Sequence, residues 1–243
     1  MTAGPLTGVV RSEWVKLRSL RSTAGAYAGI AVVLAASCAT YLTLPGGSGA
    51  DAALTALLLA ELLVGGTAVL AGAGEYSAGT ARSTFTAVPR RTLVLAGKLV
   101  VHAGAVLVLL ALGAAAGGVT AAVAAPEATG SPLDPVVVRA VLGTLVALVC
   151  IVALGLSAGV LTRSPAAGLG LVFLLLVVPV VVVTVPEVTA FLPGRAVQGL
   201  VLPAGPVPAE AGLLPPWAAA LVLTGWAAGS VLLAATVLRR RDV

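Results

Sequence analysis

The chain has 243 residues, of which 59% are hydrophobic and only 9% are charged, and its formal net charge is +5. Soluble domains are about 45–50% apolar and about 25% charged, so this composition excludes an ordinary soluble protein. It predicts an all-α integral membrane protein, because the short alternating strands of membrane β-barrels do not occur. The positive charge then indicates basic residues held on the cytoplasmic side of the plasma membrane rather than nucleic-acid binding.

The first segment, 1–23, predicts an amphipathic helix that lies in the membrane interface. Its apolar residues recur at steps of three and four, and its basic residues fall mainly on the opposite side. We expect Trp14 at headgroup depth, with Lys16 and Arg18 directed toward anionic lipid. The simpler alternative is a basic anchor with no further role. The segment lacks the features of a cleavable signal peptide.

The remainder, 24–243, predicts a six-span transmembrane domain, because six segments are long and apolar enough to cross a bilayer as helices. These segments are 24–44, 53–74, 93–124, 136–161, 166–185 and 217–238. With the N-terminus in the cytoplasm, all but two of the 14 Lys and Arg residues fall on the cytoplasmic side, the exceptions being Arg139 and Arg195. This distribution predicts that both termini are cytoplasmic.

Between the second and third spans, residues 75–91 read EYSAGTARSTFTAVPRR and form the longest cytoplasmic connection. A simple reversal needs far less, as the four-residue turn at 162–165 shows. We expect Glu75 near a helix start, where negative charge is favoured, and a short helix that Pro89 ends. The extra length predicts a structured element that contacts a cytoplasmic partner.

Two features lie inside the predicted spans. Glu61 is near the middle of the second span, where insertion of a carboxylate costs about 2.5–3.5 kcal/mol. It is either an acid of a transport pathway or a residue of helix packing, and both alternatives stay open. Pro179 should kink the fifth span.

The segment 186–216 is too rich in Pro and Gly to span a membrane, yet too apolar for a free loop. It predicts a re-entrant helix or a surface helix on the outer side, and the alternative is an ordinary loop. Cys38 and Cys150 lie in apolar runs without metal-ligand spacing, so they predict packing residues and no metal site. We expect His102 to be a hydrogen-bonded residue at the membrane interface.

The chain has no recognisable nucleotide-binding loop. The only Gly-Lys pair, Gly97-Lys98, is followed by Leu99, and Thr92 stands where the motif needs its first glycine. The spans also lack the paired Asp, Ser/His or His/Glu sets of an intramembrane enzyme. We therefore expect a protein that is not an enzyme and binds no cofactor itself.

Three stretches resemble the permease subunit of an ABC-2 type (type V exporter) ABC transporter of the kind found in actinobacteria. They are SEWVKLRSLRS at 12–22, GEYSAGTARSTFTAVPRRTLVLAGKL at 74–99, and the last span with its RRRD end. In the second stretch the family pattern of an acid, Gly-Thr, Pro, a basic residue and Gly-Lys falls on Glu75, Gly79, Thr80, Pro89, Arg90 and Gly97-Lys98.

The resemblance implies that 75–91 is a coupling loop that docks on a separate ATPase subunit, which binds ATP and Mg²⁺. The residues it assigns to coupling are Glu75, Tyr76, Gly79, Thr80, Arg82, Pro89 and Arg90. It also implies a second permease chain, as a homodimer or heterodimer, and export of an unidentified hydrophobic or amphiphilic substrate. The alternative is a membrane anchor that recruits a cytoplasmic partner and transports nothing.

Overall fold

A computed structural model of the chain describes residues 5–19, 21–43, 46–88, 90–124, 135–182, 186–202 and 212–240, with the side chains at 5, 21–23, 46–54, 85 and 186 left aside. The described residues form helices and no strands. In chain order the helices are α1 (Pro5–Ser19), α2 (Arg21–Thr43), α3 (Gly46–Ser77), α4 (Ala81–Ala87), α5 (Arg91–Ala124), α6 (Pro135–Thr162), α7 (Pro165–Leu176), α8 (Val178–Val181), α9 (Pro186–Thr189), α10 (Pro193–Val201) and α12 (Pro216–Arg240).

Five of the described helices are long and apolar enough to cross a membrane, as expected for a multi-pass membrane protein. They are α2, α3, α5, α6 and α12. Their apolar stretches reproduce five of the six predicted spans to within a few residues at most ends. The agreement follows from the length and uniform hydropathy of these segments, which leave no other way to satisfy the backbone in lipid.

The predicted fifth span, 166–185, is not one continuous helix in the described residues. α7 has 12 residues, and α8, with four, begins after a break at Val177. Pro179 occupies the first turn of α8, where its missing N–H cannot continue the helix of α7. Val177, between α7 and α8, keeps helical dihedral angles (φ −90°, ψ −47°), so Pro179 kinks the segment as predicted. Residues 183–185 lie outside the described part of the chain.

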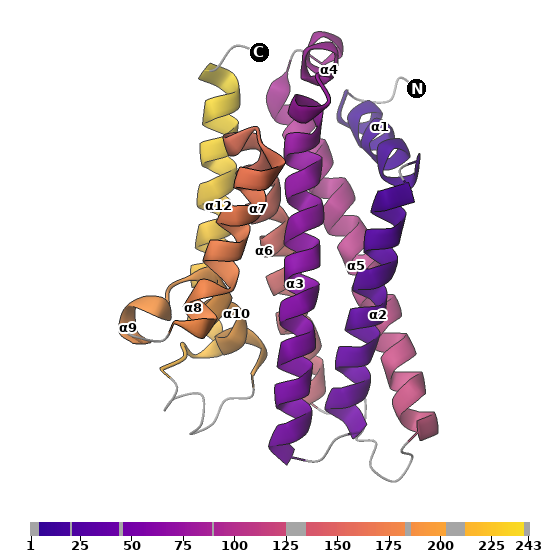
Figure 1. Cartoon of the computed structure of the whole chain (residues 1–243), viewed down its shortest axis with the longest axis vertical. Helices are drawn as coiled ribbons and strands as arrows, with labels where there is room; N and C mark the ends of the chain where they lie inside the picture. The colour runs from indigo at the N-terminus through magenta and orange to yellow at the C-terminus, as the bar shows by residue number, and fades with distance from the viewer. Residues whose placement is uncertain are drawn as a thin grey trace.

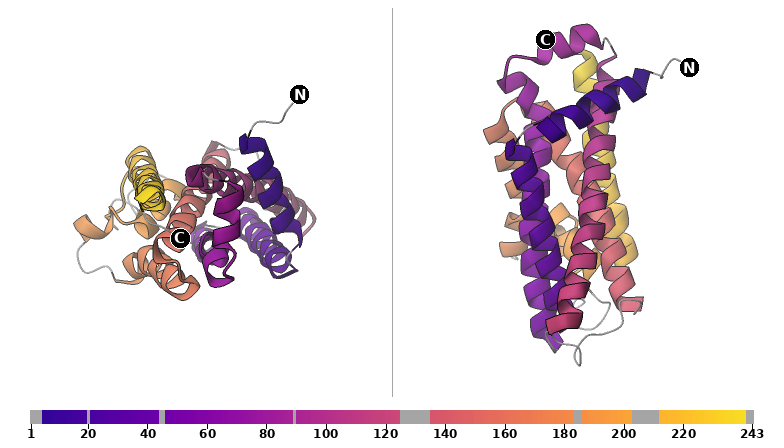
Figure 2. Two further views of the ribbon diagram at one scale, coloured as in Figure 1. Left: turned by 90° about the horizontal axis from the view of Figure 1, so that it is seen from above. Right: turned by 90° about the vertical axis from the view of Figure 1, so that its right-hand side faces the viewer.

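The long helices form a bundle that places α1, α4 and both ends of the described chain at one end (Figure 1). α2 and α5 run away from this end, and α3, α6 and α12 return to it. Figure 2 shows α1 lying across the end of the bundle at a steep angle to α2, with α4 beyond it. We call this the α1 end.

Glycines bring the backbones of the central helices into direct contact. A methyl group added to Gly159 of α6 would lie 2.4 Å from the carbonyl oxygen of Val69, and one added to Gly155 would lie 2.6 Å from that of Gly65. α2 and α5 meet in the same way, since a methyl group at Gly117 would lie 2.5 Å from the oxygen of Ala35. Such small residues permit the close approach that stabilises helix pairs in membranes.

At the opposite end, the predicted outer segment 186–216 contains α9 and α10. α10 is buried against α6, α7 and α12. Nη2 of Arg139, on α6, donates to the carbonyl oxygen of Leu202 at 2.6 Å, and Nε1 of Trp226, on α12, donates to that of Phe191 at 2.9 Å. These bonds hold α10 inside the bundle, while re-entry of this segment into a membrane stays a prediction.

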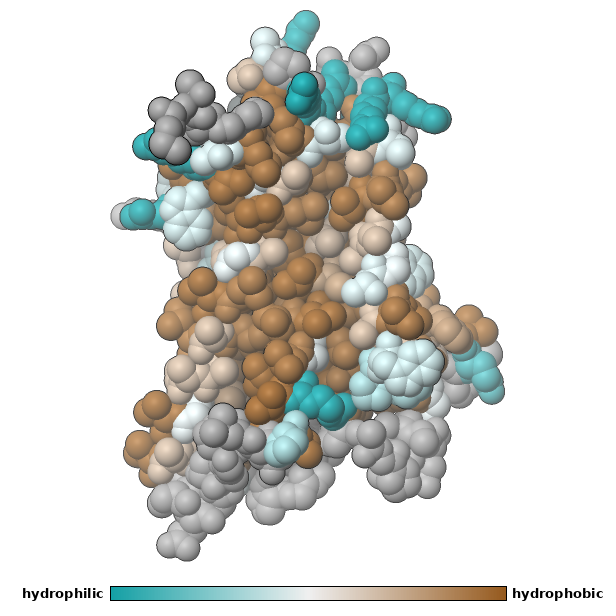
Figure 3. Space-filling model, turned by 180° about the vertical axis from the view of Figure 1, so that it is seen from behind, coloured by the Kyte–Doolittle hydropathy of each residue, from teal (hydrophilic) through white to brown (hydrophobic). Residues whose placement is uncertain are grey.

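The outer surface of the bundle is largely apolar. Figure 3 shows hydrophobic residues across the middle of the molecule, with hydrophilic residues gathered mostly at the α1 end. Many large apolar side chains on this surface are at least half exposed, among them Val108 and Leu112 of α5 and Leu221 and Leu232 of α12. Exposed apolar surface of this extent matches a lipid environment.

Candidate functional site

α3 ends at the α1 end in a Schellman motif, in which a left-handed residue lets the next two N–H groups reach back to the helix. Gly79 has a φ of +70°. Its N–H donates to the carbonyl oxygen of Tyr76 at 3.2 Å, and the N–H of Thr80 donates to that of Glu75 at 2.9 Å. The turn at Gly79 and Thr80 thus ends α3, and Thr80 is the N-cap residue of α4, which begins at Ala81.

The predicted position of Glu75 near a helix start was wrong. Glu75 lies in the last turn of α3, because the helix continues three residues past the point where the sequence becomes polar. A carboxylate is unfavourable near the negative end of a helix dipole. Lys16 and Lys98 offset this unfavourable interaction by pairing with the Glu75 carboxylate. The charge of Glu75 is therefore stabilised by these partners and not by the dipole of its own helix.

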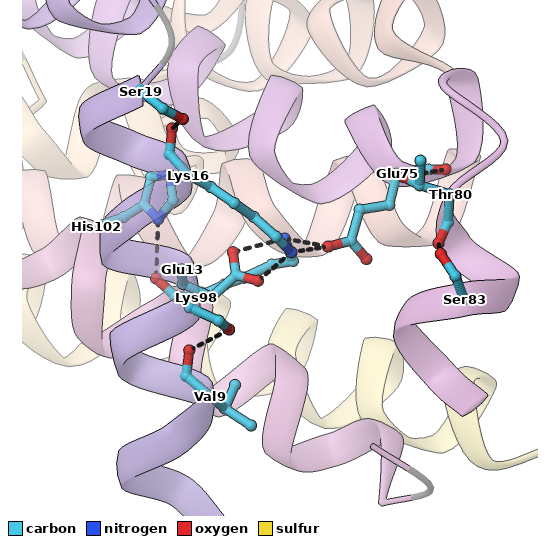
Figure 4. Close-up of polar contacts among 10 residues, drawn as sticks. Val9, Glu13, Lys16, Ser19, Glu75, Thr80, Ser83, Lys98 and His102 are labelled. Atoms are coloured by element: carbon cyan, nitrogen blue, oxygen red, sulfur yellow. Dashed lines mark hydrogen bonds and ion pairs between the residues drawn. The ribbon is translucent and has the colours of Figure 1, made fainter. Parts of the chain in front are cut away.

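Four charged residues from three helices converge beside Glu75, as Figure 4 shows. We call Glu13, Lys16, Glu75 and Lys98 the charged quartet. Nζ of Lys16 lies 2.6 Å from Oε1 of Glu13 and 2.7 Å from Oε1 of Glu75. Nζ of Lys98 lies 2.9 Å from Oε2 of Glu13 and 3.1 Å from Oε1 of Glu75. The quartet is therefore a closed ring of alternating charge that joins α1, α3 and α5.

The quartet is largely withdrawn from water. The side chains of Glu13 and Lys98 are 4% and 7% exposed and that of Glu75 is 12% exposed, whereas Lys16 is 45% exposed. Buried charges are tolerated only when they are paired and hydrogen-bonded. Each member of the quartet has two partners of opposite charge, so removal of any one leaves another charge buried with a single partner.

The pKa values of two quartet members follow from this pairing. Burial of Glu13 opposes its ionisation, but Lys98 and Lys16 outweigh burial, so the pKa of Glu13 is lowered. Burial of Lys16 opposes its positive charge, but the hydrogen bonds to Glu13 and Glu75 outweigh burial, so the pKa of Lys16 is raised. Both residues are thus held in the charged state.

A glycine next to Lys98 brings α1 close enough for the quartet to form. A methyl group added to Gly97 would lie only 2.5 Å from Cγ1 of Val9. Val9 and Glu13 are one helical turn apart on the buried face of α1. The Gly97-Lys98 pair therefore contacts both Val9 and Glu13 of α1. Gly97 leaves room for the side chain of Val9, and Lys98 forms an ion pair with Glu13.

Further contacts attach other elements to the same end. The guanidinium of Arg163, in the turn between α6 and α7, lies over the ring of Tyr76 at 5.1 Å from its centre. Nη1 of Arg91, at the start of α5, donates to the carbonyl oxygen of Leu238 in α12 at 3.3 Å. The last turn of α3 and the first turn of α5 are thus tied to α1, to the α6–α7 turn and to α12.

α4 projects from the α1 end and makes few contacts with the other helices (Figure 2). Arg82, on α4, and Arg90, just after it, are both exposed. An open cleft of about 780 Å³ separates α4 from α1, and Lys16 and Arg90 contribute to its lining. This end of the molecule therefore presents a positively charged, hollowed surface.

The structure brings together some of the predicted site residues and separates others. Lys16 and Glu75 belong to the quartet, and Tyr76, Gly79, Thr80, Arg82 and Arg90 lie around it or on α4. Glu61 is buried within the bundle and Pro179 lies in α8, both away from the quartet. Pro89 lies outside the described residues, and Arg18 is exposed on α1.

Sequence reasoning missed Glu13 and gave Lys98, a residue of the family pattern, no charged partner. The predicted apolar face of α1 is not the one that packs on the bundle, because Trp14 is 46% exposed while Val9 and Glu13 are buried. A signal was present, since Glu13 is the single acid of an otherwise basic helix and lies four residues after Val9. Its buried partner Lys98, however, is 85 residues away, and no local pattern connects the two.

Comparison of the chain with protein-family models found no matching family, and comparison with curated proteins found no match. The resemblance to ABC-2 type permeases is thus a prediction from the quoted stretches alone. Among the described residues, no group of three or more His, Cys, Asp or Glu side chains is arranged to hold a metal ion. What the site offers chemically is a set of fixed charges at a junction of helices.

Proposed function

We propose that this chain is the transmembrane permease subunit of an ATP-driven ABC-2 type exporter, and that its α1 end receives force from a separate ATPase subunit. The observation that carries the proposal is the charged quartet. It links α1, the end of α3 and the start of α5 immediately beside α4, a short helix that projects from the α1 end of the bundle. A displacement of α4 would therefore be passed to three helices together rather than to a single loop.

In this proposal α4 is the docking element, and Arg82 and Arg90 contact acidic side chains of the ATPase. α4 is joined to α3 by the Schellman turn at Gly79 and to α5 by the short return at 88–90. Both neighbouring helices carry a quartet residue, Glu75 and Lys98. The chain supplies no catalytic group, and its contribution is a difference in contacts between two states of the complex.

The proposed topology has six membrane crossings with both termini in the cytoplasm of a plasma membrane. α7 and α8 make the fifth crossing. The 17 residues from Pro165 to Val181 span only about 25 Å as a helix, less than the roughly 30 Å of a bilayer core. Since α10 is buried beside α8, we propose that α8 and α10 together complete the fifth crossing. A second permease chain would pair with this one through its apolar surface.

The alternative is a non-transporting membrane anchor, which would use the same α1 end to hold a cytoplasmic partner. The rigid attachment of α1 by the quartet is compatible with a static platform as well as with a moving one. Both proposals require a bound partner. They differ in whether the helices move when that partner hydrolyses ATP.

The deciding experiment uses the full chain purified from native membranes in mild detergent. We expect an ATPase with a nucleotide-binding loop to co-purify, and the pair of substitutions Arg82→Glu and Arg90→Glu to abolish its association without changing membrane insertion. The reconstituted complex should then move a fluorescent amphiphile in an ATP-dependent manner. Co-purification without transport would favour the anchor, and the absence of any co-purifying ATPase would overturn both the exporter and its coupling site.

A further inference from the structure

A cavity of about 340 Å³ lies between α1, α2, α3 and α5 and has one polar end and one apolar end. The charged quartet and His102 line the polar end. Apolar residues line the rest, including Leu17 of α1, Ala26 of α2 and Leu70 of α3. A cavity with this division suits a molecule that has a polar head and a hydrocarbon chain.

The cavity reaches the outer surface of the bundle along α3. Leu70 lines it and is itself 51% exposed, on the same face of α3 as the exposed residues Leu59 and Leu63. This face belongs to the apolar surface that we assign to lipid. A hydrocarbon chain can therefore leave the cavity beside Leu70 without entering water.

At the polar end of the cavity, the atoms that can still form a hydrogen bond to a ligand are acceptors. Oε1 of Glu75 accepts from both lysines, and no hydrogen bond in the described part of the chain uses its Oε2. Nδ1 of His102 lies 2.9 Å from the carbonyl oxygen of Lys98 and must donate to it, which leaves Nε2 of the neutral ring as an acceptor.

The quartet itself carries no net charge, because its two lysines balance its two carboxylates. An anionic head would meet acceptors and no spare donor other than the partly exposed Lys16. A primary ammonium group has three N–H donors and matches the acceptor character of Glu75 and His102. A quaternary ammonium has the same charge but no donor.

We propose that this cavity binds an amphiphile through its primary ammonium group, with the hydrocarbon chain leaving beside Leu70. The source of this chemistry is either an aminophospholipid of the bilayer or a free alkylamine. As the substrate class of an exporter, the inference rests on the function proposed above, whereas binding itself does not require an ATPase. It also places the ligand head against the quartet, so that occupancy of the cavity and the position of α1 are linked.

The test measures binding to the full chain alone, in nanodiscs of phosphatidylcholine, by titration calorimetry. Dodecylammonium should bind at least about tenfold more tightly than dodecyltrimethylammonium, as expected from hydrogen bonds that only the first can donate. His102→Phe should reduce this preference. Thr120→Val is the control, because Thr120 lies on the same helix as His102, bonds only to the oxygen of Ala116 among the described residues and is exposed.

Equal affinity for the two ammonium probes, or a preference that survives His102→Phe, would overturn the proposal. Competition by phosphatidylethanolamine added to the nanodiscs would identify the lipid as the resident ligand, and its failure to compete would identify a free amine. Because no ATPase is present, a failure here leaves the coupling proposal standing. Binding without a co-purifying ATPase would leave the site standing without an export role.

Discussion

Oε2 of Glu13 lies 2.9 Å from Nζ of Lys98, and this ion pair joins two helices whose residues are 85 positions apart in the sequence. Both side chains are almost fully buried, and each also forms a second ion pair. Each also contacts a second charge that belongs to the junction, Lys16 for Glu13 and Glu75 for Lys98. The position of α1 on the bundle is therefore set by electrostatics that operate in a nearly dry environment.

The first prediction concerns removal of one charge from this junction. Glu13→Gln leaves Lys98 buried with only Glu75 as an acid partner, so we expect a loss of about 3 kcal/mol in stability. Thermal unfolding in detergent measures the loss. Glu187→Gln, at an exposed position on α9, is the control and should have no effect.

The double variant Glu13→Gln/Lys98→Met separates the cost of an unpaired charge from the value of the pair. We expect it to be more stable than Glu13→Gln alone, because the buried cation is removed together with its partner. If the losses from the two single substitutions simply add, the ion pair does not couple α1 to α5.

The second prediction concerns shape at the same contact. Gly97→Ala places a methyl group 2.5 Å from Cγ1 of Val9, so α1 must shift and we expect a loss of about 1–3 kcal/mol. Adding Val9→Ala should restore part of the stability. Gly104→Ala, on the same helix with open space around it, should be neutral or stabilising, since alanine favours a helix. A loss at Gly104 as large as that at Gly97 would contradict the packing argument.

The third prediction concerns the turn that directs α4. Gly79 has a φ of +70°, which an alanine adopts at a cost of about 1–2 kcal/mol. We expect Gly79→Ala to change the direction of α4 and to weaken association with the proposed ATPase subunit more than it lowers the unfolding temperature. Gly74→Ala is matched, because Gly74 lies in the last turns of the same helix with nothing within 4 Å of the added methyl group. Equal partner binding by the two variants would show that the turn does not position the docking element.

The fourth prediction concerns pH. The pKa of Glu13 is lowered from its ordinary 4.5, so its contribution is present above that pH and is lost as the pH falls through the lowered value. The pKa of Lys16 is raised from its ordinary 10.5, so its contribution is present below that pH and is lost as the pH rises through the raised value. The difference in unfolding temperature between wild type and Glu13→Gln/Lys98→Met should therefore be constant from about pH 6 to 9 and should change outside that range. A difference that varies steadily across neutral pH would exclude the quartet as its origin.

The sequence by itself determined the class of the protein and most of its helices. Segments such as 93–124 and 217–238 are so uniformly apolar that length and hydropathy alone specify a helix, because lipid offers no other partner for the backbone. The length of the polar insert at 75–91 also predicted a structured element where a simple turn would have been shorter. The alternation of basic and apolar segments placed α1, α4 and both chain ends on one side.

Tertiary structure alone decided which charges act together. Glu13, Glu75 and Lys98 lie in separate helices, and an isolated acid or lysine in the sequence carries no record of its distant partner. Tertiary structure also decided the course of the fifth predicted span. Residues 166–182 have the hydropathy of a span, but Pro179 removes a helical hydrogen bond and α10, which has no span-like pattern, occupies the space beside α8. Hydropathy measures how a segment partitions between water and lipid, whereas packing and pairing depend on which other segments are brought to the same place.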